Sequence, residues 1–326
     1  MQLTIADATE LAVRTLVRHK MAEPHARLVA AHLVDTALCG DEFSSLPRLL
    51  AIVEELQRRQ PPREIRIERE TANSALIDGG DNIAYVVSDV AIDKAVDICG
   101  RSGVAVVGAN NTWYGGRLAY YTERVARKGY VVLHACNAIA RVAPFGGIDR
   151  IMGTNPLSIA FPSEDEPFVL DIGTSATSSG DVVLSRAKGE RLPPAVAIDA
   201  DGLPTDDPNA ALAGAFLAWG GQRGSGLALA IQMLGVMVGS PITIKEVSSY
   251  GLFFIVFDPQ LFMPAKQFRA RVSEFRNAVH FSRPAPGVSQ VRLPGEGSAH
   301  RRKRALAAGV IEIDDRIYAR ILKLCA

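Results

Sequence analysis

The residues best suited to chemistry lie in polar segments between apolar stretches of the chain. Arg48 stands near the start of a predicted helix, where a guanidinium can hold a carboxylate with two hydrogen bonds, although a surface ion pair is the usual fate of a single arginine. Thr154 and Asn155 precede a proline in GTNP, which is either an ordinary turn or one that aims a polar group at a ligand. Asp171 and Asp181 enclose a stretch rich in Ser, Thr and Gly, which is either a flexible loop or the lining of a polar site.

A glycine-rich segment, GGQRGSG at residues 220–226, opens a strongly apolar predicted helix. Glycines at a helix N-terminus let backbone N–H groups approach an anion, and the helix dipole favours negative charge there. The segment matches neither the P-loop nor the dinucleotide fingerprint. It therefore indicates either a phosphate site or glycines that serve helix packing.

The charge balance argues against a dedicated nucleic-acid binder. The 326 residues carry 36 basic and 35 acidic side chains, a net charge of +1, so no broad basic field is available for a polyanion. The cluster HRRKR at 300–304 is short, and we expect a solvated surface turn there. His25 and His32 share a face of a predicted helix, but without a third ligand we expect surface or interface residues and no metal site.

The four cysteines are widely spaced, and this is typical of a reducing compartment. The first twenty residues lack the apolar centre and cleavage site of a signal peptide, and no apolar run is long enough to cross a membrane. We therefore expect a cytoplasmic protein without membrane contact.

The periodicity of apolar residues predicts a mixed α/β architecture with one large domain or two to three lobes. Thr4 followed by Asp7 resembles the start of a helix. Helices are predicted at residues 4–20, 23–38, 45–60, 86–101, 119–129, 262–281 and 313–324, and within the glycine-initiated segment 220–239. Strands are predicted within 63–80 and at 103–109, 130–137 and 250–258.

Five segments of the sequence resemble the type-2 malate/L-lactate dehydrogenase family, which includes ureidoglycolate dehydrogenase and the reductases of Δ1-piperideine-2-carboxylate and Δ1-pyrroline-2-carboxylate. In chain order the segments are GTNPLSIAFP, PFVLDIGTSATSSGDV, IDADGLPTDDPNAALAG, GGQRGSGLALAIQMLG and LPGE. The resemblance covers nearly the whole chain and is strongest from 141 to 240. It implies a non-Rossmann NAD(P)-binding domain with a largely antiparallel sheet (71–283) and a helical domain formed by both chain ends (1–70 with 284–326). It also implies a homodimer with the active site near the subunit interface.

The resemblance also implies roles for individual residues. Substrate would be bound by Arg48, Thr154, Ser179 and Gly180, and Asp181 matches an acidic residue that orients and charges the family's catalytic histidine. The cofactor would be bound by Trp113, Tyr114, Gly115, Gly116, Arg117, Asp171, Ile172, Gly173, Gln222, Arg223, Leu293, Pro294, Gly295, Glu296, Gly297, Ser298 and Ala299. Arg223 stands where a partner for a 2′-phosphate would be, which slightly favours NADP(H) over NAD(H).

Two departures from the family pattern bear on mechanism. Family members usually carry a Ser-His pair where this chain has Phe43-Ser44, and a second histidine where it has Trp113. Ser44 is too weak an acid to replace an imidazolium directly, but it can relay a proton from water or from Asp181. The neighbouring Asp41 and Glu42 are most simply solvated, although one of them is a possible replacement acid.

These departures favour reduction of a C=N bond over reduction of a C=O bond. An alkoxide left by hydride transfer to a ketone needs a proton from a placed acid, whereas a cyclic imine can arrive already protonated. We therefore expect an NAD(P)H-dependent reductase of a cyclic imino acid, with Ser44 and Asp181 as catalytic residues and a small carboxylate as substrate. The alternatives are a 2-hydroxy-acid dehydrogenase with a non-histidine proton donor, and a cofactor-binding or scaffold homologue without turnover.

Overall fold

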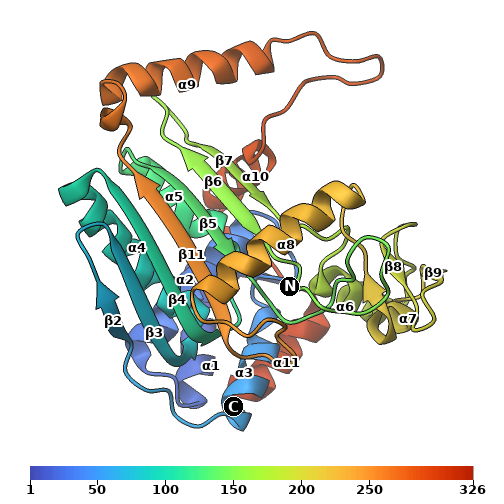
Figure 1. Ribbon diagram of the computed structural model, residues 1–326. Coiled ribbons are helices and arrows are strands. Elements are labelled where there is room, and N and C mark those ends of the chain that lie inside the picture. The colour runs from blue at the N-terminus through green and yellow to red at the C-terminus, as the bar shows by residue number, and fades with distance from the viewer. Residues whose placement is uncertain (326) are drawn as a thin grey trace.

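The computed structural model describes residues 1–325 and centres on a seven-stranded sheet (Figure 1). Only β3 and β4 run parallel, and all other neighbouring strands are antiparallel. The predicted α/β architecture with a largely antiparallel sheet is therefore confirmed. In spatial order the strands are β2 (Arg66–Glu70), β3 (Ser74–Ile83), β4 (Val104–Trp113), β11 (Tyr250–Phe257), β5 (Val131–Cys136), β6 (Leu157–Phe161) and β7 (Phe168–Ile172).

Helices cover both faces of this sheet (Figure 1). Because side chains alternate along a strand, Val107 and Ala109 of β4 join the buried core with α4 (Ala84–Ser102) and α5 (Ala119–Arg127). Gly108 points the other way, where an added Cβ would lie 2.5 Å from Val238, just beyond α8 (Gln222–Met237). The sheet is thus enclosed by helices from different parts of the chain.

Both chain ends contribute to one helical layer, as predicted. The short strands β1 and β12 pair antiparallel and hold the two ends together. Thr4 begins the first helix as predicted, because its Oγ1 accepts a hydrogen bond from the Asp7 N–H at 3.0 Å. The elements of this layer are β1 (Gln2–Thr4), α1 (Ile5–Arg18), α2 (Glu23–Leu38), α3 (Arg48–Arg58), β12 (Val310–Glu312) and α11 (Asp315–Cys325).

The predicted boundary at residue 70 divides elements that are joined in the structure. It assigns β2 to the helical part, but β2 hydrogen-bonds to β3 as an edge strand of the sheet. The exact domain limits stay a prediction.

The polar centre of the sequence forms a small lobe beside the sheet (Figure 1). A separate apolar cluster that includes Val182, Leu192 and Phe216 stabilises it. Its elements are α6 (Ser179–Lys188), β8 (Ala197–Ile198), β9 (Pro204–Thr205), α7 (Pro208–Ala213) and β10 (Ala215–Phe216). After β11, a 3₁₀ turn (Pro259–Leu261) leads to α9 (Ala265–His280), which has no fully buried side chain. It contacts the loop between β6 and β7 through Ser273 and Arg276.

Two expectations about the surface are wrong. The HRRKR cluster is part of a regular helix, α10 (Glu296–Ala308), which begins after Gly295 and ends before Gly309; its Arg302 is drawn into ion pairs with carboxylates of α2 and α5. His32 is fully buried, because rings from α4 and α5 surround it at centroid distances of 4.3 to 5.3 Å.

Within residues 1–325, no helix combines the length and apolar character needed to cross a membrane.

Candidate active site

One cavity of about 1960 Å³ brings most of the predicted site residues together. Its walls come from the segment between α2 and α3, the loop after β4, the end of β7, the start of α6 and the start of α10. The predicted residues that line it are Ser44, Arg48, Tyr114, Gly115, Gly116, Arg117, Thr154, Asp171, Gly173, Ser179, Gly180, Asp181, Leu293, Pro294, Gly295, Glu296, Ser298 and Ala299.

Five predicted cofactor residues do not line this cavity. Trp113 is buried in the core beneath it, and its indole N–H donates to the Asp81 carbonyl at 2.9 Å. Gln222 and Arg223 are exposed at the start of α8. The other two are Ile172 and Gly297, each adjacent to a residue of the wall.

Arg48 is available to bind an anion. Its guanidinium carbon lies 3.8 Å from the centre of the Tyr114 ring and 5.5 Å from that of Phe43, so aromatic faces hold it in place. In the described part of the chain, no carboxylate lies within ion-pair distance of it. A carboxylate that enters the cavity therefore meets a guanidinium whose charge is not yet neutralised.

Phe43 and α6 close the cavity beside Arg48. The Phe43 ring lies directly against Gly180, where a Cβ would come within 2.1 Å of Cδ1, so only glycine fits this position. The next residue, Asp181, belongs to a capping box: its Oδ2 accepts from the Ser178 hydroxyl at 2.8 Å, and its own N–H donates to Ser178 Oγ. Asp181 is thus held at the start of α6, where it lines the cavity.

The GTNP turn places Thr154 and buries Asn155. The Thr154 carbonyl accepts hydrogen bonds from both the backbone N–H and the hydroxyl of Thr174, at 2.9 and 3.0 Å. Asn155 is fully buried, and its amide donates to the Ala228 carbonyl at 2.9 Å. Of the two polar residues in this turn, only Thr154 reaches the cavity.

Asp171, near the end of β7, is the acidic residue of the cavity wall whose pKa is shifted furthest from its ordinary value. Its Oδ2 accepts from the Ala119 N–H at the start of α5, at 2.7 Å. Burial raises the pKa of Asp171 to about 6; the hydrogen bond from Ala119 and the charge of Arg117 oppose this rise, and Asp41 adds to it.

No histidine is found among the described residues that line the cavity. The tyrosines of the wall do not replace it, because burial raises the pKa of Tyr114, Tyr121 and Tyr250 above the ordinary value of 10. Among the lining groups whose pKa is shifted, Asp171 is the one near neutrality. The segment 1–325 also contains no cluster of His, Cys, Asp and Glu suited to a metal ion.

The sequence matches the model of the malate/L-lactate dehydrogenase family over residues 3–322. The chain belongs to this family. It is 31% identical to the L-sulfolactate dehydrogenase of Methanocaldococcus jannaschii, over 97% of this chain and 94% of that protein. It is 30% identical to Delta(1)-pyrroline-2-carboxylate reductase 1 of Burkholderia ambifaria, over 99% of this chain and 97% of that protein.

A solved family structure has the same fold. The delta1-piperideine-2-carboxylate reductase of Pseudomonas syringae superimposes with a TM-score of 0.89 at 26% identity, over 99% of each chain. The predicted family membership is confirmed, and so is the predicted enzyme class, because the family consists of oxidoreductases.

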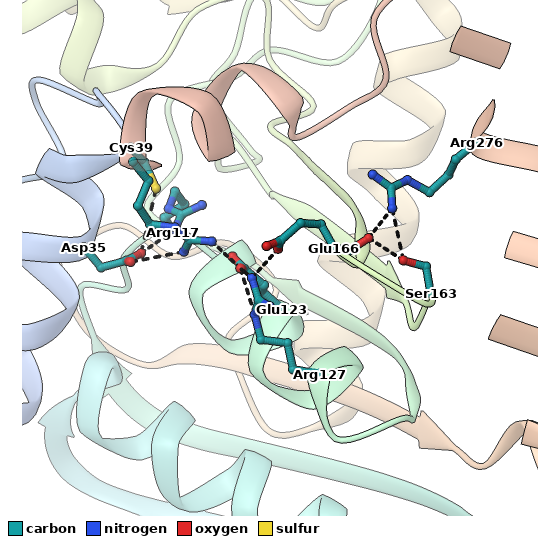
Figure 2. Close-up of polar contacts among 9 residues, drawn as sticks. Asp35, Cys39, Arg117, Glu123, Arg127, Ser163, Glu166 and Arg276 are labelled. Carbon is teal, nitrogen blue, oxygen red and sulfur yellow. Dashed lines mark hydrogen bonds and ion pairs between the residues drawn. The ribbon is translucent and has the colours of Figure 1, made fainter. Parts of the chain in front are cut away.

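Some residues of the site were not identified from the sequence, because they belong to no recognisable motif. Arg141 and Tyr250 line the cavity but stand in ordinary strand-like surroundings in the sequence. A network of charged side chains lines this region (Figure 2). Asp35 pairs with Arg117 and with Arg302, Arg302 pairs with Glu123, and Arg127 joins Glu123 to Glu166 in the loop between β6 and β7. The sequence signal for the helix that carries Arg302 was the stretch from Ser298 to Ala308, which contains no glycine or proline and is followed by Gly309.

Proposed function

We propose that this enzyme is an NAD(P)H-dependent reductase of a C=N bond next to a carboxylate, in a cyclic imino acid such as Δ1-pyrroline-2-carboxylate or Δ1-piperideine-2-carboxylate. One observation carries the proposal: the cavity offers an unpaired guanidinium at Arg48 and, among the described residues of its wall, no imidazole. The reductases of these two imino acids among the relatives support it.

The proton requirement distinguishes C=N from C=O reduction at this site. Hydride addition to a ketone creates an alkoxide, and a placed general acid accelerates that step by roughly 10² to 10⁴. A protonated imine accepts a hydride at carbon, its C=N π pair moves onto nitrogen, and a neutral amine results without any acid in that step. The absence of an imidazole therefore slows reduction of a protonated imine less than it slows reduction of a ketone.

The residues of the wall have complementary roles in this reaction. Arg48 binds the substrate carboxylate, assisted by Thr154 and by Ser179 and Gly180 at the start of α6. The Asp181 carboxylate, which lines the cavity at the start of α6, stabilises the positive charge of the iminium electrostatically. Ser44, whose backbone N–H donates to Asp41 Oδ1 at 2.9 Å, holds a water or relays a proton to the product amine.

The wall also fits a nicotinamide cofactor, which supplies the hydride when bound. Gly115 leaves room for close approach, whereas Gly116 lets the loop pack on His32 and Tyr85, which an added Cβ would meet at 2.3 and 2.5 Å. Asp171 and Gly173 present polar groups, and residues 293–299 lead into the N-terminus of α10, where an anion is favoured. NADP(H) is the favoured form in this proposal: Arg223 lies outside the cavity wall, but its exposed side chain at the start of α8 has no carboxylate partner among the described residues and can pair with a 2′-phosphate. Arg223→Ala should weaken NADPH binding far more than NADH binding in a fluorescence titration, and equal losses would refute this preference.

A homodimer forms the proposed working unit. Met237 and Ile242, on and just after α8, are 63% and 80% exposed, and Met233 extends this apolar surface along the helix. A second copy of the chain covers this surface in our proposal.

The test is steady-state oxidation of NADPH and NADH with a panel of cyclic imino acids and 2-keto acids. We expect turnover of the five- or six-membered imino acid with a higher kcat/KM than for pyruvate or oxaloacetate. Robust keto-acid turnover without imine turnover would overturn the proposal, and cofactor binding without any turnover would favour a scaffold role.

One observation favours a second candidate, a 2-hydroxy-acid dehydrogenase. Asp171 has a pKa of about 6, close to that of a free imidazole, so its protonated form can act as the acid that a ketone requires. A pH–rate profile separates the two candidates. Dependence of kcat on one group titrating near pH 6, lost in Asp171→Asn, would favour the keto acid.

A further inference from the structure

Asp35, on α2, joins two segments that are far apart in the sequence. Its Oδ2 accepts from Arg117 Nη2 at 2.6 Å, and its Oδ1 accepts from Arg302 Nη1 at 3.2 Å. Arg117 ends the loop after β4, and Arg302 follows residues 293–299 on α10. Each carboxylate oxygen therefore holds one of the two predicted cofactor segments (Figure 2 shows Asp35 beside Arg117).

The charges in this junction are shielded from water and balanced. The side chains of Arg117, Asp35 and Arg302 are 14%, 19% and 19% exposed. Arg302 also bonds Glu123, and although burial alone would raise the pKa of Glu123, its hydrogen bonds from Arg302 and Arg127 lower it. Removing one carboxylate leaves guanidinium charge uncompensated in partly buried surroundings, which is costly.

The end of α2 also leads directly into residues 39–50, which carry Ser44 and Arg48 and are called the substrate segment below. Asp35 lies in the last turn of α2, where its carbonyl accepts from the Cys39 N–H at 3.0 Å. Arg301 of α10 donates from Nε to the Cys39 carbonyl at 2.7 Å, and it packs on Gly40, where a Cβ would lie 2.5 Å from its Cδ. Gly40 has φ +78°, a conformation that favours glycine. Ser44 lies four residues after Gly40, and Arg48 lies eight residues after it.

We propose, on the basis of the function proposed above, that Asp35 is a positioning residue that couples the two cofactor segments to the placement of Ser44 and Arg48. When a cofactor orders residues 114–117 and 293–299, the guanidinium groups of Arg117 and Arg302 hold Asp35, and with it the end of α2 and the substrate segment. Cofactor and substrate therefore bind with positive coupling, which thermodynamics makes reciprocal.

Hydrogen–deuterium exchange of the ligand-free protein tests the structural part of this proposal, and it requires no measurement of enzyme activity. Asp35→Asn should speed amide exchange together in residues 39–50, 114–117 and 293–305. The matched control is Asp89→Asn, whose carboxylate is 18% exposed, against 19% for Asp35, and pairs with Arg124 between α4 and α5; neither residue of this pair lines the cavity. Exchange in 39–50 that is unchanged in Asp35→Asn, or equally raised in Asp89→Asn, overturns the proposal.

Ligand coupling tests the functional half. In the wild type, pyrrole-2-carboxylate, a planar analogue of the imino acid, should tighten NADPH binding by roughly 5- to 150-fold, the usual range for coupled sites. Asp35→Asn should bring this factor close to one, and Asp35→Glu, which keeps the carboxylate, should restore part of it. A wild-type factor retained in Asp35→Asn refutes the coupling.

The two proposals fail in different ways. If the wild type binds no nicotinamide cofactor, the proposed function is wrong, while the exchange data still decide the role of Asp35. If Asp35→Asn does not fold, as judged by circular dichroism, Arg302→Gln removes the Asp35–Arg302 pair from the other side, together with the Arg302–Glu123 pair. Its exchange in residues 39–50 then decides the question in the same manner.

Discussion

Replacing Asp171 by asparagine should stabilise the free enzyme at alkaline pH. The wild-type carboxyl sits in the cavity wall, where burial disfavours its ionised form and raises its pKa to about 6 from the ordinary 3.8. Asparagine has nearly the same shape and still offers an oxygen to the Ala119 N–H. It carries no charge, so it avoids the cost of desolvating one.

The size and sign of the effect follow from the pKa difference. A shift of about 2 units corresponds to an upper limit of about 3 kcal/mol, reached above pH 7 where the carboxyl is ionised in both states. It is an upper limit because the carboxyl opens onto the cavity, where water screens it. Below pH 6 the folded state takes up a proton before the unfolded state does, so the wild type gains stability as the pH falls. The advantage of Asp171→Asn should shrink by about 1.4 kcal/mol between pH 8 and pH 5.

Urea unfolding of both proteins at pH 8, 7, 6 and 5 measures this difference. Subtracting the two curves cancels the other titrating groups, and Asp97→Asn on the exposed face of α4 serves as the control for the substitution itself. A stability difference that is independent of pH, or one that grows as the pH falls, would refute the position assigned to Asp171.

Three further substitutions test other parts of the site. Ser44→His should raise 2-keto-acid turnover by about 10²-fold or more by placing an imidazole in the cavity as a general acid, and unchanged keto-acid kinetics would show that proton supply does not limit that reaction. Gly180→Ala should destabilise the protein by about 1 to 3 kcal/mol in urea unfolding, because its methyl group meets Phe43; a neutral effect would contradict the observed packing. Met237→Asp should convert the proposed dimer into monomers in light scattering, and a dimer that persists would place the subunit contact elsewhere.

Local patterns carried most of the predictable structure. The helices at both ends and the buried strand at 250–257 follow from the spacing of apolar residues, since each must present an apolar face to its neighbours. The resemblance in GTNP and the following segment placed Thr154 and Asp181, which do line one cavity. Arg48 was predicted as an anion ligand or a surface ion pair, and the structure leaves it without an acidic partner.

The remainder depends on contacts between distant segments. His32 is buried because rings of α4 and α5 surround it, and no spacing within α2 shows this. Arg302 forms part of a helix and an ion-pair network because Asp35 and Glu123 lie opposite, whereas the local sequence shows only a basic run. The pKa of Asp171 likewise results from its position behind α5, which appears only in the folded chain.

Transfer of deuterium from nicotinamide-labelled NADPH to Δ1-pyrroline-2-carboxylate tests the central claim most directly. We expect mass spectrometry to find proline with one deuterium at Cα, in an amount equal to the NADPH oxidised, and to find little labelled lactate when pyruvate replaces the imine. Label found in lactate and absent from proline would contradict the account.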